Sequence, residues 1–161
     1  MAEKDYIDKI HLIKRKLSLV NEEFNMLPDM NKNKKYIKEY FCHSGLLIET
    51  INKNYYILEY GNNSKSKVEL RNVSITIQNN TFIDDEYTWD IEQDQHEDIS
   101  LESKKITIKK IKKIMEDIVK DQKYNIMSWN CHMAQEKTRK AIGLKVKNKY
   151  NLEKILYSMI L

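Results

Sequence analysis

The chain contains few residues that interrupt or cross-link a polypeptide, and each scarcity excludes a class of protein. Only three glycines and one proline occur in 161 residues, so each glycine is expected where the backbone needs it. The two cysteines, Cys42 and Cys131, are too few for a small scaffold held together by disulfides. The sequence also lacks the run of about 18–20 apolar residues that a membrane-spanning helix requires.

Both ends of the sequence bear on where the protein works. The N-terminal stretch, MAEKDYIDKI, carries charges throughout and does not resemble a secretory signal. Together with the low cysteine content, it predicts a reducing, intracellular setting. The C-terminal stretch, ILYSMIL, resembles the beginning of a hydrophobic tail and leaves membrane association open.

Length and composition predict a single globular domain. A chain of 161 residues with 41% hydrophobic residues is long enough to bury one core. The formal net charge of +4 permits an anionic partner without requiring one. Because the lysines are not interleaved with aromatic residues and are nearly balanced by acidic residues, no specific nucleic-acid partner is expected.

The first apolar pattern of the chain has the spacing of an α-helix. Between positions 6 and 24, apolar residues recur at alternating steps of four and three, as on one stripe of a helix. They are Tyr6, Ile10, Ile13, Leu17, Val20 and Phe24. The pattern predicts an N-terminal helix whose stripe packs on the domain, and dimerisation of two chains through this helix is the alternative. Pro28 and the polar run that follows it end the segment.

Two β-rich runs come next, YFCHSGLLIET at 40–50 and YYILEYG at 55–61, on either side of a short turn. They predict a β-hairpin, which is covered on both sides because its middle is apolar on both faces. In KVELRNVSITIQ the apolar parity shifts near Asn72, which predicts a strand with a bulge or break. One more strand is predicted around Trp89, beside an acidic run at 84–98 that is expected to be mostly an exposed loop.

Three helical segments are predicted in the second half of the chain. Residues 104–122 carry an apolar face with lysines around it, residues 131–143 form a helix that ends at a glycine, and residues 152–160 form a last amphipathic turn or two. The order of elements predicts an α+β fold, a small antiparallel sheet packed against helices. It also divides the chain into an N-terminal helical segment, 1–34, and the domain on which it packs, 35–161.

Cys131 is the candidate nucleophile because of its predicted place at the start of a helix. Asn130 or Ser128 before it is a good N-cap residue. The backbone N–H groups and the positive end of the helix stabilise a thiolate there and lower the thiol pKa below about 8.5. Small residues then follow on the same helical face, namely Ala134, Thr138 and Ala141. A lone cysteine is also found as a small buried hydrophobe, so a second group is needed to support the catalytic interpretation.

His43 is the candidate for that second group. A thiolate needs a base within ~3–4 Å, both to form an ion pair and to protonate the leaving group later. His43 lies in the first strand of the predicted hairpin, directly before Ser44 and Gly45. Because Gly45 has no side chain, we expect it to let a helix terminus approach this strand.

A third polar group would orient the imidazole. If the hairpin loop has an odd number of residues, centred on Lys53, Glu59 faces the same side as His43. A two-residue turn would place Tyr60 on that side instead. Glu59 is preferred because its charge complements imidazolium. Glu49 shares the parity of His43 but lies about 20 Å away along the strand.

Two Cys-His pairs, at 42–43 and 131–132, raise the alternative of a zinc site. Neighbours on a strand point to opposite faces, so the first pair does not easily share one ion. No metal and no cofactor is therefore expected. His132 is then expected at the surface or around the site, and His11 and His96 in solvent.

Three short motifs occur in a particular order, H-S-G at 43–45, Y-I-L-E-Y-G at 56–61 and Y-N-x-x-x-x-N-C-H at 124–132. Together they resemble the circularly permuted NlpC/P60 superfamily, whose fold is papain-like. The superfamily includes the lecithin:retinol acyltransferase-like acyltransferases and phospholipases, and the PPPDE isopeptidases. In it the histidine strand precedes the cysteine helix, as it does here. The resemblance covers about residues 36–143.

The resemblance implies a role for each candidate residue. Cys131 would be the nucleophile, His43 the base and Glu59 the third polar residue, a position where the acyltransferase branch usually has a second histidine. The hydrophobic C-terminal anchor typical of the family is not visible here. Together with the Lys-, Ile- and Asn-rich composition, which is typical of AT-rich coding, the resemblance suggests a member from a large DNA virus of insects.

The sequence therefore predicts a cysteine-dependent acyl hydrolase or acyltransferase that works through a thioester, with a phospholipid ester as substrate. Backbone N–H groups at the helix start would hold the oxyanion, with Asn130, His132 and Tyr60 around them. The lysine-rich stretch 104–113 is a candidate for peripheral contact with an anionic membrane. Two alternatives keep the same fold: a cysteine isopeptidase that removes a ubiquitin-like modifier, and a non-catalytic interaction module.

Overall fold

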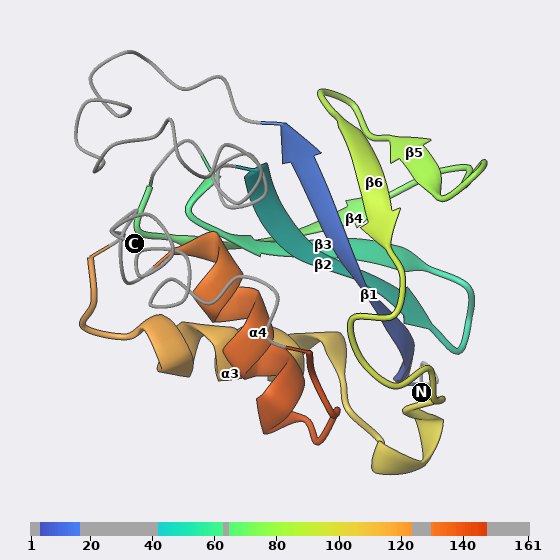
Figure 1. The fold of residues 1–161 in the computed structure, drawn as a ribbon. Helices are drawn as coiled ribbons and strands as arrows, with labels where there is room; N and C mark the ends of the chain where they lie inside the picture. Colours follow the sequence, from blue (N-terminus) through green and yellow to red (C-terminus); the bar gives the residue numbers. More distant parts are fainter. Residues whose placement is uncertain (1–3, 17–41, 63–64, 124–129, 148–161) are drawn as a thin grey trace.

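The computed structural model describes residues 4–16, 42–62, 65–123 and 130–147, and over these residues the predicted α+β class is confirmed (Figure 1). Six antiparallel strands form one curled sheet in the order β4-β3-β2-β1-β6-β5, and two α-helices pack on it. The described elements are β1 (Ile7–Lys16), β2 (Cys42–Thr50), β3 (Tyr55–Tyr60), β4 (Val68–Val73), β5 (Thr81–Ile83), β6 (Thr88–Glu92), the 3-10 helix η2 (Glu102–Lys104), α3 (Ile108–Val119) and α4 (Cys131–Ala141).

The first strand corrects the predicted N-terminal helix. β1 lies in the middle of the sheet, paired with β2 along its length and with β6 on its other side. Because the strand is covered on both faces, Ile10 and Leu12 are buried on one face and Ile13 on the other. Its apolar residues therefore do not alternate, and their spacing imitates a helical stripe. Over residues 7–16 the predicted helix is wrong, so the suggested dimer contact has no helical stripe there; residues 17–24 lie outside the described residues.

The later elements follow the prediction closely. The hairpin of β2 and β3, the strand β6, and the helices α3 and α4 are confirmed, and β4 ends at Val73, next to the predicted break. The backbone of Gly143 has a φ of +93° just after α4, in the left-handed region that a helix-terminating glycine favours. The three-residue strand β5 was not predicted, and the last predicted helix lies outside the described residues.

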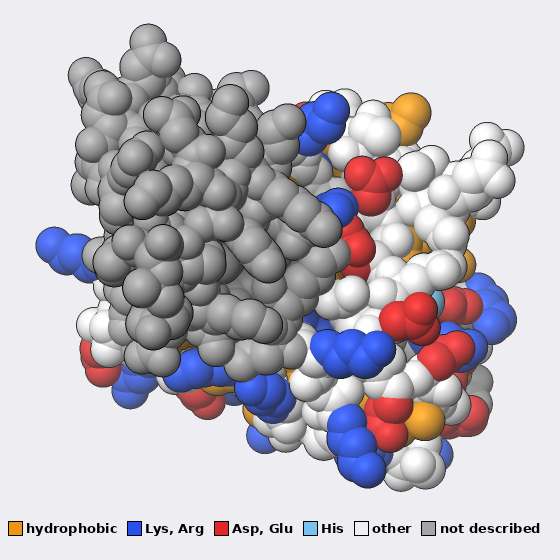
Figure 2. Space-filling view, viewed as in Figure 1, with side chains coloured by type: hydrophobic (Ala, Val, Ile, Leu, Met, Phe, Trp, Pro, Cys, Tyr) orange, Lys and Arg blue, Asp and Glu red, His pale blue; other side chains and the backbone are white. Residues whose placement is uncertain are grey.

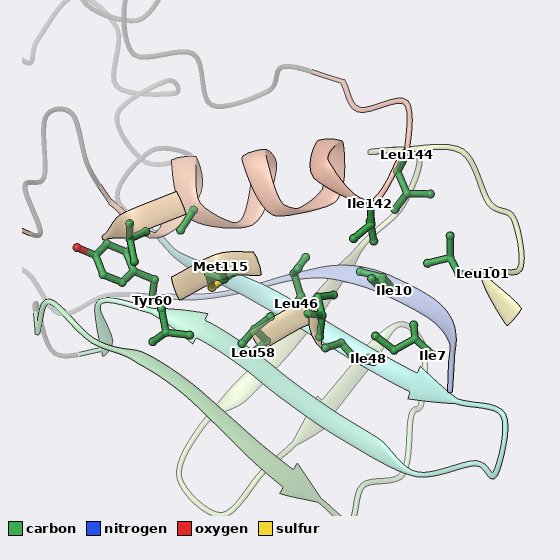
Figure 3. Packing of buried hydrophobic residues seen from close by; sticks show 14 residues of the cluster. Ile7, Ile10, Leu46, Ile48, Leu58, Tyr60, Leu101, Met115, Ile142 and Leu144 are labelled. Carbon is green, nitrogen blue, oxygen red and sulfur yellow. The ribbon is translucent and has the colours of Figure 1, made fainter. Parts of the chain in front are cut away.

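The helices α3 and α4 cover one face of the sheet. Leu46 of β2 and Leu58 of β3 are fully buried there, in one cluster with Met115 of α3 and Ala134 of α4 (Figure 3). Thr107 starts α3 by accepting a hydrogen bond from the backbone N–H of Lys110. A second buried cluster lies on the other face and consists of Ile13, Leu47, Ile57, Phe82 and Trp89.

The sheet curls until its two edges are joined. β4 and β5 are the edge strands of the sheet, yet Arg71 of β4 donates from Nη2 to Oδ2 of Asp84, the residue that follows β5, at 3.0 Å. The curl places the rings of Phe82 and Trp89 in the cluster opposite the helices, where Trp89 is fully buried. The sheet therefore covers its second face with its own far end.

A pair of neighbouring substitutions tests the central position of β1. Leu12 is fully buried but does not belong to the helical stripe, whereas Ile13 does. On a covered strand we expect Leu12→Ala and Ile13→Ala each to lower the free energy of unfolding by about 2–5 kcal/mol, because each leaves a cavity on its own face. Urea unfolding followed by circular dichroism measures both, with Lys9→Ala as the control, because the Lys9 side chain on the same strand is partly exposed. If only Ile13→Ala lowered the free energy of unfolding, the result would favour a helix over these residues.

Candidate active site

Cys131 is the first residue of α4, as the sequence predicts. The side chain of Asn130 caps the helix, since its Oδ1 accepts hydrogen bonds from the backbone N–H groups of His132 at 3.0 Å and Met133 at 3.1 Å. The thiol is buried beside this helix end. The partial positive charge of the helix N-terminus favours its ionised form.

The side chains of His43 and Glu59 meet inside the hairpin. His43 Nε2 lies 3.0 Å from Glu59 Oε1, and both residues are 1% exposed. The pairing of β2 with β3 leaves a three-residue loop at 51–53, closed by Lys53 with a φ of 63°. The odd loop length is confirmed and gives Glu59 the side that His43 occupies, although the loop is centred on Asn52 and not on Lys53.

Gly45 makes room for Glu59 and not for a helix terminus. A Cβ atom at Gly45 would lie 3.1 Å from the backbone oxygen of Leu58 and 3.3 Å from Cβ of Glu59, and the nearest atoms all belong to β3. The expectation that this glycine admits a helix is therefore wrong. Its lack of a side chain lets the carboxylate of Glu59 lie directly beside the His43 strand.

His43 and Cys131 are hydrogen-bonded to each other, and each shifts the pKa of the other. Burial alone would lower the pKa of His43, but its hydrogen bonds with Cys131 and Glu59 outweigh that effect and raise the pKa to about 9. Burial likewise raises the pKa of the Cys131 thiol. The charge and hydrogen bond of His132 and the hydrogen bond of His43 outweigh it, so this pKa is well below its usual value. Both shifts favour the imidazolium form of His43 and the thiolate form of Cys131.

Two residues predicted around the site lie on the helix-covered face of the sheet. His132 is buried, and its Nδ1 is 2.7 Å from the hydroxyl of Ser44 on β2, the neighbour of His43. It also contacts the Cys131 thiol directly, so a surface position for His132 is wrong. Tyr60 belongs to the buried cluster beneath α3 and α4, and its hydroxyl is hydrogen-bonded to Ser66.

Two charged residues behind Glu59 were not predicted from the sequence. Arg71 on β4 donates from Nη2 to Oε2 of Glu59 and to Oδ2 of Asp84, both at 3.0 Å. Asp84 also accepts from the indole Nε1 of Trp89 at 2.9 Å, and the Trp89 ring lies 5.9 Å from the ring of His43. Asp84 begins the acidic run that the sequence predicts to be mostly an exposed loop, but it is buried and holds the far end of this network.

A separate open hollow of about 830 Å³ lies at the other end of β1 and β2. His11, Glu49 and His96 are among the residues that line it, and the side chains of the Cys131 site are not. His11 and His96 are partly buried, so the expectation that they lie in solvent is wrong. Nδ1 of His96 lies 3.0 Å from Nη1 of Arg139, so this histidine takes part in packing α4 against the loop that follows β6.

The described residues also bear on metals and membranes. They contain no group of three or more His, Cys, Asp and Glu side chains placed to hold a metal ion. Within the same ranges, no helix has the length and apolar character that crossing a bilayer requires.

The chain matches no protein-family model, no curated protein and no solved structure.

Replacement of Glu59 by glutamine tests the electrostatic coupling. We expect the pKa of His43 to fall from about 9 in Glu59→Gln, because the carboxylate raises it through both a hydrogen bond and its charge. NMR titration of the histidine ring protons measures the change. Glu49→Gln on the same hairpin is the matched control, since Glu49 acts on His11. Equal shifts of the His43 pKa in the two variants would contradict the contact.

Proposed function

We propose that the protein is a cysteine-dependent acyl hydrolase or acyltransferase, with Cys131 as nucleophile, His43 as acid and base, and Glu59 as the residue that orients His43. The observation that carries this proposal is the buried, continuous contact from Cys131 at a helix N-terminus through His43 to Glu59. A thiolate, an imidazolium and an orienting carboxylate in that order are the minimal parts for nucleophilic acyl transfer.

The proposed reaction proceeds through a thioester. The Cys131 thiolate attacks the carbonyl carbon of an ester, and the carbonyl oxygen becomes an oxyanion near the N–H groups at the start of α4. The carbon–oxygen bond then breaks while His43 gives its proton to the departing alcohol. Neutral His43 next takes a proton from water or from an acceptor hydroxyl, whose oxygen attacks the thioester. The carbon–sulfur bond breaks, the acid or new ester leaves, and the ion pair is restored.

Each nitrogen of the His43 ring has a separate task in this proposal. Glu59 occupies Nε2, which leaves the other ring nitrogen for the sulfur and the leaving group. The carboxylate stabilises the imidazolium and fixes the ring plane. Asn130 holds the helix end by capping two backbone amides, and the N–H of Cys131 itself is the oxyanion donor we propose.

A circularly permuted papain-like fold of the NlpC/P60 kind is part of the proposal. It is supported by the order of the site residues, with the histidine on β2, its partner on β3 and the cysteine on a later helix. Glu59 departs from the second histidine that the acyltransferase branch usually carries. Acyl transfer therefore rests on the chemistry of the site and not on that branch.

We further propose lipid esters as the substrate class, with a peripheral contact to an anionic membrane through α3. Lys109, Lys110 and Lys113 are exposed on α3 while Ile111 and Met115 face the core. On the face in Figure 2, charges of both signs are intermixed and few apolar side chains show among the described residues. Contact with a bilayer would thus depend on lysine attraction to anionic headgroups and not on apolar insertion.

The pH dependence of hydrolysis follows from the ion pair. The thiolate exists above the lowered pKa of Cys131, and the imidazolium exists below a pH of about 9. Attack on the ester needs the thiolate, and departure of an alkyl alcohol needs the imidazolium. We therefore expect a bell-shaped pH dependence of kcat/KM with its alkaline limb near pH 9. Alkylation by iodoacetamide needs only the thiolate and should not fall on that limb. An alkylation rate that rises only near the pKa of a free thiol would contradict the ion pair.

Substitution of the two cysteines tests the nucleophile. We expect Cys131→Ala to abolish both esterase activity and rapid labelling by an electrophilic thiol probe, because it removes the attacking sulfur. Cys42→Ala is the matched control, since Cys42 is also a buried cysteine and precedes His43 on the same strand. Labelling of Cys131 no faster than in the denatured protein would rule out catalysis and favour an interaction module.

Substrate class is measured on the same variants. Phospholipid vesicles and a peptide carrying an isopeptide-linked ubiquitin-like modifier are incubated with the wild type and with Cys131→Ala. We expect fatty acid release by the wild type alone. Cleavage of the isopeptide bond without fatty acid release would replace the lipid proposal with an isopeptidase.

A further inference from the structure

Arg15 is a buried cation beside the candidate active site. It lies near the end of β1 directly opposite His43 of β2 and is 6% exposed. Its Nη2 donates to Oδ1 of Asn62 at 2.7 Å. The guanidinium carbon lies 3.8 Å from the centre of the Tyr87 ring and 5.4 Å from that of Trp89.

The described residues give Arg15 no counter-charge. Within ranges 4–16, 42–62, 65–123 and 130–147, no carboxylate forms an ion pair with it, and its Nε has no hydrogen-bond partner. Arg71 is the comparison within the same protein, because it is 31% exposed and still has two carboxylate partners. A buried charge is normally paired, since aromatic faces attract a cation but do not neutralise it. Among the described residues, Arg15 therefore has a buried positive charge without an anionic partner.

Arg15 lies beside the residues that we propose carry out the reaction. Arg15 and His43 are paired residues on adjacent strands, whose side chains lie on the same face at a cross-strand distance of about 5 Å between Cβ atoms. Both also contact the Trp89 ring, from 5.4 Å and 5.9 Å. Because His43 is hydrogen-bonded to Cys131, an anion held by Arg15 would lie one side chain away from the reacting sulfur.

We propose that Arg15 binds a phosphate group of the acyl substrate, so that the preferred substrates are esters with a phosphate a few bonds from the scissile carbonyl. The inference rests on the proposed function and specifies its substrate. The planar guanidinium can pair two of its N–H groups with two phosphate oxygens, and Asn62 fixes its orientation for that contact. Acyl-glycerophosphates have the required combination of ester and phosphate, while a neutral isopeptide does not.

Kinetics on matched soluble esters test the proposal. Full-length wild type is given a short-chain acyl-glycerol 3-phosphate and the uncharged acylglycerol with the same acyl chain, both as monomers. We expect kcat/KM to be higher for the phosphate ester, and the ratio of the two values to fall roughly 10- to 100-fold in Arg15→Met, as for a lost hydrogen bond to a charged group. Arg15→Lys keeps the positive charge but cannot donate two parallel hydrogen bonds from one planar group, so it should recover only part of the ratio.

A neighbouring cation provides the control. Lys14 is on the same strand and is ion-paired with Glu92, so Lys14→Met should leave the ratio at the wild-type value. The same esters presented in vesicles separate recognition of a lipid headgroup from recognition of a soluble phosphate. An effect of Arg15→Met that occurs only in vesicles would assign the contact to the membrane surface and overturn the proposal. A ratio that persists with a carboxylate in place of the phosphate would overturn the choice of phosphate.

Binding provides a readout that does not depend on turnover. Glycerol 3-phosphate is titrated by calorimetry into Cys131→Ser, and into Cys131→Ser carrying Arg15→Met or Arg15→Lys. We expect binding in the first, loss in the second and weakened binding in the third. If no ester is hydrolysed but this pattern holds, the proposed function fails and the phosphate site stands. If the phosphate ester and the uncharged ester are hydrolysed with similar kcat/KM and glycerol 3-phosphate does not bind, the phosphate site fails and the proposed function stands.

Discussion

The carboxylate of Glu59 is buried between two cations, and both the curled sheet and the candidate site depend on that arrangement. One oxygen contacts His43 and the other contacts Arg71, while Arg71 continues to Asp84 beyond the opposite edge strand. A carboxylate that is 1% exposed is stable only when its charge is compensated. The interaction that compensates Glu59 is thus also the one that ties the two edges of the sheet together.

The network closes on itself through an aromatic side chain. Asp84 accepts a hydrogen bond from Trp89, and the Trp89 ring packs against His43. The imidazole is therefore positioned by the Glu59 carboxylate and by an indole that the same network fixes. All of these groups except Asp84 stand on strands, which hold side chains more accurately than loops do. Cys131 comes from a different part of the fold, anchored through α4 and the contact of His132 with Ser44.

Sequence patterns predicted the features that depend only on residues close together in the chain. A capping asparagine placed Cys131 at a helix start, and the parity of the hairpin brought Glu59 to the side of His43. The pattern failed where tertiary contacts decide the structure. β1 is covered on both faces and so has no alternation, and the buried state of Asp84 depends on a curl that joins distant strands. One signal was available: only three of the 28 basic residues are arginines, which suggests sites where a lysine does not suffice.

The two arginines near His43 differ in how the described residues compensate their charge. Arg71 has two carboxylate partners and serves to hold Glu59. Arg15 packs against Tyr87 and Trp89, whose rings attract the cation, and none of the described carboxylates forms an ion pair with it. Trp89 therefore lies close to both His43 and Arg15, a cation that forms no ion pair with the residues the structure describes. Because both side chains pack against the same ring, an anion bound at Arg15 as we propose would have a defined position relative to His43.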